Sequence, residues 1–133
     1  MPKVRVSLFL SGDHVPLNDI TEEIGVLPTK VRKKEDFPVD SILAGVAKDT
    51  WEFRTDKIEC SVISTQLDKI KIIFGPKIEI IKDLSKRYLI SVNIIIMVEA
   101  EMGEYPEFVL TRENIDFLSL LHSEIGFDLY INE

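Results

Sequence analysis

The sequence predicts an α+β fold in which helices cover one face of a mostly antiparallel sheet. Three observations lead to this prediction. Apolar residues alternate along several short segments, as in half-buried strands, and recur three or four positions apart along longer ones, as in amphipathic helices. Glycine or proline separates most of these segments. The chain has 133 residues, of which 45% are hydrophobic and 29% charged, and this fits a single globular domain over residues 1–133.

The N-terminal segment predicts a strand followed by a short helix. Within residues 3–11, apolar residues at the even positions 4–10 alternate with Arg5, Ser7, Phe9 and Ser11, which is the strand period. Pro16 suits the first turn of a helix, and Asn18 or Asp19 can cap its free amides. Gly25 then provides the left-handed residue that ends this helix.

A basic segment and a strand with the single tryptophan follow. Residues 29–34 predict a short edge strand, because cations on a sheet edge discourage pairing with other chains. Residues 37–49 read as a loop, with a helical turn at 42–47 as an alternative. Residues 51–55 alternate again, with aromatic and β-branched side chains on one face, and predict a second strand.

Two helices and a long strand occupy the middle of the chain. Gly75-Pro76 divides a helical pattern into residues 61–74 and 76–87, because proline cannot continue a helix. Residues 89–100 are rich in β-branched types and predict a central strand. Since Ile94-Ile95-Ile96 is apolar on both sides, we expect this strand to be covered on more than one face.

The C-terminal part predicts a hairpin, a helix and a closing strand. We expect residues 107–110 to form a short strand after a turn at 102–106, and Thr111 to cap a helix that ends at Gly126. Residues 127–131 then alternate as the last strand. From Trp51 onward the order is strand, helices, strand, strand, helix, strand, which is the split βαβ pattern of ferredoxin-like folds.

The sequence contains no recognisable catalytic constellation. It has no phosphate-binding glycine loop, and its only cysteine, Cys60, and two histidines, His14 and His122, show no metal-ligand spacing. We therefore predict a protein that is not an enzyme and uses no cofactor or metal. A single cysteine favours a reducing compartment, and no apolar run approaches the roughly 20 residues of a membrane helix, so we expect a cytoplasmic protein.

Two clusters are candidate binding sites. Lys30 and Arg32, with Trp51 as an aromatic platform, could hold an anion; alternatively the cations protect a sheet edge and Trp51 faces the core. Glu101, Glu104 and Tyr105, in the expected acidic hairpin over 99–107, could hold a basic protein or form a solvated turn. The net charge of −7 argues against general nucleic-acid binding.

Several short phrases resemble a family of small bacterial proteins described as domain of unknown function 4279. They cover nearly the whole chain and are Gly12-Asp13, Ile20-Thr21-Glu22-Glu23-Ile24-Gly25, Pro28-Thr29, Trp51-Glu52-Phe53 and Phe127-Asp128-Leu129-Tyr130-Ile131. The chain departs from the family pattern at Lys33-Lys34-Glu35, where a glycine is expected. Because this family has no established activity, the resemblance implies a fold and no site residues.

Compactness, acidity and the missing catalytic groups lead to a hypothesis of function. We expect a non-enzymatic cytoplasmic protein-binding module, in its most specific form an immunity-type inhibitor of a basic toxin. The alternative is a sensor of small molecules or anions, or a minor enzyme, that uses the region from Lys30 to Trp51. A third interpretation is a homodimer formed through an exposed sheet edge.

Overall fold

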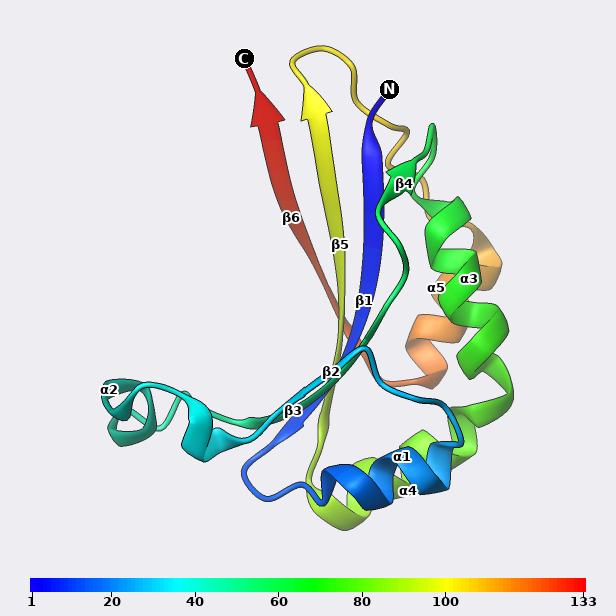
Figure 1. The fold of residues 1–133 in the computed structure, drawn as a ribbon. Coiled ribbons are helices and arrows are strands. Elements are labelled where there is room, and N and C mark those ends of the chain that lie inside the picture. Colours follow the sequence, from blue (N-terminus) through cyan, green and yellow to red (C-terminus); the bar gives the residue numbers. More distant parts are fainter.

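The computed structural model describes residues 1–133 and contains one six-stranded sheet with helices packed on one of its faces (Figure 1). The predicted α+β class with a mostly antiparallel sheet is confirmed. The strands are β1 (Lys3–Gly12), β2 (Lys30–Arg32), β3 (Asp49–Arg54), β4 (Ile58–Glu59), β5 (Ser91–Glu101) and β6 (Glu124–Asn132). The helices are α1 (Leu17–Ile24), α2 (Val39–Leu43), α3 (Ser64–Phe74), α4 (Ile78–Tyr88) and α5 (Arg112–Leu120), with short 3-10 helices η1 (Lys34–Asp36) and η2 (Gly75–Lys77).

The strand order is β2-β3-β1-β5-β6, and β4 pairs with one end of β1. β1 is antiparallel to both β3 and β5, so β3 and β5 run in the same direction. Because α3 and α4 connect these two strands and β1 lies between them, they form a split βαβ unit. β5, α5 and β6 form a second βαβ unit, whose strands are adjacent and parallel.

The hairpin predicted over 99–107 is not formed. Residues 107–110 make only an isolated bridge, between Glu107 and Val62, and β5 pairs instead with β1 and β6. β6 pairs with nine consecutive residues of β5, whereas the short segment begins directly after Pro106, which has no amide hydrogen to donate. The predicted ferredoxin-like order has two consecutive strands before the last helix, and the second of these strands is therefore absent.

The last helix ends earlier than predicted. Thr111 caps α5 through reciprocal hydrogen bonds with Asn114, both of 3.1 Å, as expected of a capping residue. His122, with a φ of 53°, takes the left-handed conformation that was assigned to Gly126. Gly126 lies inside β6, because pairing with β5 continues through this part of the chain.

The remaining N-terminal expectations are met in part. Gly25 ends α1 in the left-handed conformation, but neither Asn18 nor Asp19 caps this helix, whose N-cap position is Pro16. The segment predicted as a loop contains α2, which begins three residues before the alternative turn. In Figure 1, α2 lies at the far end of β2 and β3, away from the helices that cover the sheet.

The core lies between the sheet and α1, α3, α4 and α5, where 25 buried residues form one apolar cluster. Even-numbered residues of β1 and β5 face these helices. No helix covers the opposite face, which we call the open face and where Ile95 is half-buried. The prediction that β5 is covered on more than one face by packed elements is therefore wrong. None of the helices is long and apolar enough to cross a membrane.

Candidate functional site

Trp51 belongs to the core. It is fully buried on the helix side of β3, and its Nε1 donates a hydrogen bond of 3.0 Å to Thr21 Oγ1. Its ring packs edge-on against Phe74, with 6.2 Å between the centroids. The expected inward orientation is confirmed, so Trp51 is not an exposed platform beside Lys30 and Arg32.

Lys30 and Arg32 lie on β2 at one edge of the sheet and face the open side. Lys30 is opposite Glu52 in the strand register, and the Arg32 guanidinium carbon lies 3.7 Å from the centroid of the Phe37 ring. Because this guanidinium is already stacked on an aromatic ring, one of its faces is not available to an anion. The adjoining cavity has a volume of about 140 Å³ and includes Glu52, whose carboxylate would repel a bound anion.

Glu101, Glu104 and Tyr105 lie together at one end of the sheet. Glu101 ends β5, and the other two follow in the turn, where all three are exposed. A backbone hydrogen bond of 2.9 Å from the Glu104 amide to the Glu101 carbonyl closes this turn. Glu99 is already paired, because it accepts a hydrogen bond from Lys57 Nζ that holds the pKa of its carboxyl below the ordinary value.

Negative charge is concentrated in the C-terminal third of the chain. Residues 91–133 contain nine carboxylate side chains and only one lysine or arginine, Arg112, so their formal charge is −8, against +1 for residues 1–90. This segment forms β5, α5 and β6. The excess charge therefore belongs to the segment that forms one edge of the sheet, where Lys57 pairs with Glu99 and the N-terminal amine lies 3.7 Å from Glu104. Counting charges along the sequence could have found it.

β6 forms this edge and exposes an apolar stripe. Its outer side has no strand partner, and its helix-side residues are between 36% and 51% exposed: Ile125, Phe127, Leu129 and Ile131. Phe108, from the segment before α5, packs edge-on against Phe127, with 6.1 Å between the ring centroids. The strand contains no lysine, arginine or proline, which are the residues that usually protect an edge.

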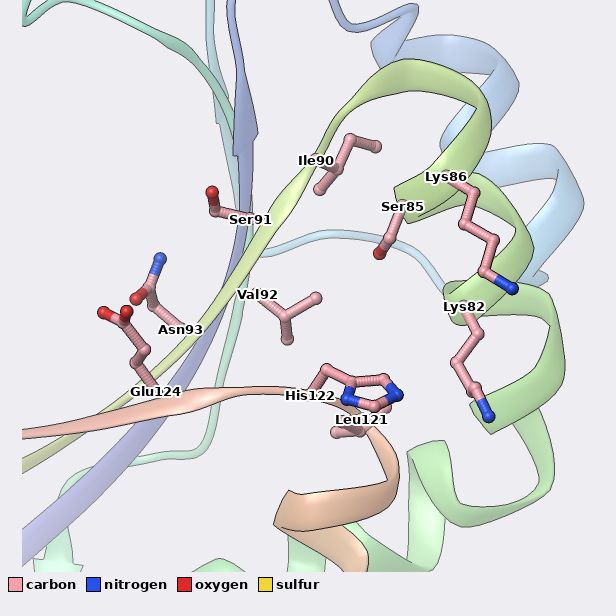
Figure 2. A pocket seen from close by; sticks show the side chains of 10 residues that line it. All are labelled: Lys82, Ser85, Lys86, Ile90, Ser91, Val92, Asn93, Leu121, His122 and Glu124. Atoms are coloured by element: carbon pink, nitrogen blue, oxygen red, sulfur yellow. The ribbon is translucent and has the colours of Figure 1, made fainter.

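A cleft lies between α4, the start of β5 and the turn that joins α5 to β6 (Figure 2). Its volume is about 400 Å³. Ile90, Val92 and Leu121 form its apolar floor, and its polar side chains on this side are Lys82, Ser85, Lys86 and His122. Figure 2 shows Asn93 and Glu124 pointing to the other side of the sheet. Local patterns did not reveal this cleft, because three separate segments build it.

No group of three or more histidine, cysteine, aspartate or glutamate side chains is arranged to hold a metal ion. The fold and these surfaces define a small α+β protein with one open sheet face and an acidic, partly apolar sheet edge. The chain belongs to the family described as Domain of unknown function (DUF4279), which matches residues 2–132. No curated protein and no solved structure matches the chain.

Proposed function

We propose that this protein is a non-enzymatic module that binds a basic protein partner along β6. The observation that carries the proposal is that an unpaired apolar edge strand lies in a segment, residues 91–133, whose formal charge is −8. Unpaired amides and carbonyls of an edge strand can pair with a strand of another chain. Surrounding carboxylates would steer a basic partner toward this edge and repel acidic ones.

The aromatic side chains at this edge supply much of the apolar contact area. Phe108, Phe127 and Tyr130 are each about half exposed, at 47%, 49% and 54%. Since an aromatic side chain buries roughly 150–250 Å², covering these three would remove roughly 300 Å² from water. A standard interface buries about 800 Å² on each partner, so these residues provide more than a third of that area before the aliphatic residues and backbone are counted.

The acidic turn extends the same surface. Glu101 is opposite Asn132, the last residue of β6, in the strand register. Glu104 and Tyr105 follow directly, and Phe108 connects this turn to Phe127. Glu101, Glu104 and Tyr105 would therefore form the acidic end of the β6 surface. An immunity-type inhibitor that neutralises a basic toxin is the specific form of this proposal.

The charge of this edge favours a basic partner over a second copy of the chain. A homodimer through β6 would bring two segments with a formal charge of −8 together. In the antiparallel pairing centred on Asp128, this carboxylate would also face its own copy, and like charges directly opposite one another destabilise a strand pair. An anion sensor at Lys30 and Arg32 has less support, because Glu52 lies in the same small cavity.

We propose the bacterial cytoplasm as the compartment. Cys60 is the only cysteine and is a buried free thiol. A fold of this size without a disulfide is usual in a reducing compartment.

The test is an affinity measurement with matched charge variants. The tagged chain is used to isolate partners from the native host, and a purified candidate is then titrated against Phe127→Lys and against Ile72→Lys. Ile72 is 73% exposed on α3 and serves as the control. We expect a basic protein in a one-to-one complex, weakened at least about tenfold by Phe127→Lys, as for a central interface residue, and unchanged by Ile72→Lys.

Three results would overturn the proposal. The first is a partner that binds both variants equally, and the second is a partner with no excess of positive charge. The third is a stable dimer of the isolated chain, measured by light scattering, that Phe127→Lys converts to a monomer. Thermal unfolding of each variant shows whether the fold is retained.

A further inference from the structure

We propose that the cleft between α4, β5 and the α5–β6 turn binds a small organic anion, a carboxylate or phosphate monoester attached to an apolar body. This inference is independent of partner binding along β6. It rests on the combination of an apolar floor with hydrogen-bond donors that are unpaired or only weakly paired within the protein. The cleft volume of about 400 Å³ is within the range of small-molecule sites, which are roughly 300–1,000 Å³.

The floor and the rim of the cleft differ in chemistry. Ile90, Val92 and Leu121 are 8%, 5% and 1% exposed and present aliphatic carbon at its base. Lys82 and Lys86 extend from α4 along one side, and His122 lies across from them (Figure 2). An apolar ligand body could therefore rest on the floor while its charged group faces the lysines.

The two lysines of the cleft have at most one long ion pair within the protein. Lys86 makes no ion pair within 4 Å, and Lys82 makes only a long contact of 3.9 Å with Glu79. Lys86 lies in the last turn of α4, where a cation also complements the helix dipole. That role does not explain Lys82, which lies nearly two turns before the helix end. An anionic ligand would satisfy both lysines.

Two further features point into the same cleft. Ser85 Oγ is buried and has no hydrogen-bond partner, although a buried hydroxyl without a partner destabilises a fold. His122 ends α5 in the left-handed conformation, with a φ of 53°, and its exposed side chain lies at the cleft. A ligand oxygen could accept a hydrogen bond from the exposed His122 side chain.

The test is a titration of the full chain, observed by amide chemical shifts in NMR. Benzoate and phenyl phosphate are the charged probes, benzyl alcohol tests the ring without the charge, and inorganic phosphate tests the charge without the ring. We expect saturable shifts at Ser85, Val92 and His122 with one or both charged probes, and at least roughly tenfold weaker binding of the two controls. The tighter of the two charged probes identifies the ligand class.

Matched variants separate binding from structure. Lys82→Met and Lys86→Met should each weaken the tighter probe about tenfold, while Lys69→Met, an exposed lysine on α3, should not. His122→Gly should weaken the probe, whereas Leu89→Gly, at the other exposed left-handed position, should not. The proposal is overturned if no probe gives saturable shifts at the cleft, or if binding is unchanged in both lysine variants. Either result leaves the proposal for β6 intact, because none of these residues lies on that strand.

Discussion

Replacing Leu89 with glycine should stabilise this protein. Leu89 follows α4 with a φ of 54° and is 84% exposed, so its side chain contributes little burial. The left-handed conformation costs about 1–2 kcal/mol for a residue with a Cβ. Glycine removes this cost but raises the entropy of the unfolded chain, which offsets about 0.4–1 kcal/mol. We expect a net stabilisation of about 0.5–1 kcal/mol, or roughly 2–4 °C in Tm for a chain of this length.

Urea and thermal unfolding of wild type and variant measure this difference. Gly45→Ala is the opposite change, because Gly45 has a φ of 73° and no atom within 4 Å of the position of an added Cβ. Strain alone should then lower the free energy of unfolding by about 1 kcal/mol. The reasoning is refuted if Leu89→Gly lowers the urea midpoint at an unchanged m-value, or if Gly45→Ala raises it.

Three further predictions concern the core, a helix cap and an ion pair. Trp51→Ala should lower the free energy of unfolding by about 3–5 kcal/mol, and an unchanged Tm would contradict its place in the core. Thr111→Ala should cost about 1 kcal/mol, while the exposed Thr65→Ala on α3 should cost less in the same urea titration; equal losses would argue against the cap. Lys57→Met should raise the pKa of the Glu99 carboxyl toward its ordinary value, observed by carbon NMR titration. Because the pKa of Glu99 is lowered in the folded state, its pairing with Lys57 stabilises the protein fully at pH values above the pKa of this carboxyl in the unfolded chain. This stabilisation is lost as the pH falls through the pKa of the folded state. If Glu99 titrates in the variant as it does in the wild type, the pair does not form.

Features with a local cause could be predicted from the sequence. The alternation in β1, the proline that divides α3 from α4, and the Thr111 cap depend on neighbouring residues and agree with the structure. Gly25 was also predicted as a left-handed helix end, because few other residues adopt this conformation without strain. The fold class followed from these local periods.

Features that depend on strand pairing could not be predicted in this way. The spacing of Leu118, Leu121 and Ile125 fits one face of a continuing helix, but Ile125 pairs with Ile94 in the sheet. Pairing with a distant strand outweighs the local period here, and β6 therefore begins two residues before Gly126. The same competition removed the expected hairpin, since β6 occupies the side of β5 that residues 107–110 would have needed.

The candidate sites differ in how far they could be predicted from the sequence. Glu101, Glu104 and Tyr105 are neighbours in the chain, and their exposure follows from the turn that carries them. The burial of Trp51 could be argued only from its neighbours on the strand, and the cleft could not be foreseen, because its residues come from α4, β5 and the α5–β6 turn. Such sites require the tertiary arrangement of the elements.

The two edges of the sheet differ in how well they are protected against the addition of another strand. β2 has three residues and carries Lys30 and Arg32, which oppose the addition of another strand. β6 has nine residues, exposes Phe127 and Leu129, and has carboxylates but no cations to protect it. Under the proposed function, acidic groups would oppose pairing of this edge with its own copy and would attract a basic chain, because like charges repel and opposite charges steer association. The proposed function therefore predicts that β2 excludes an added strand and that a single partner binds at β6.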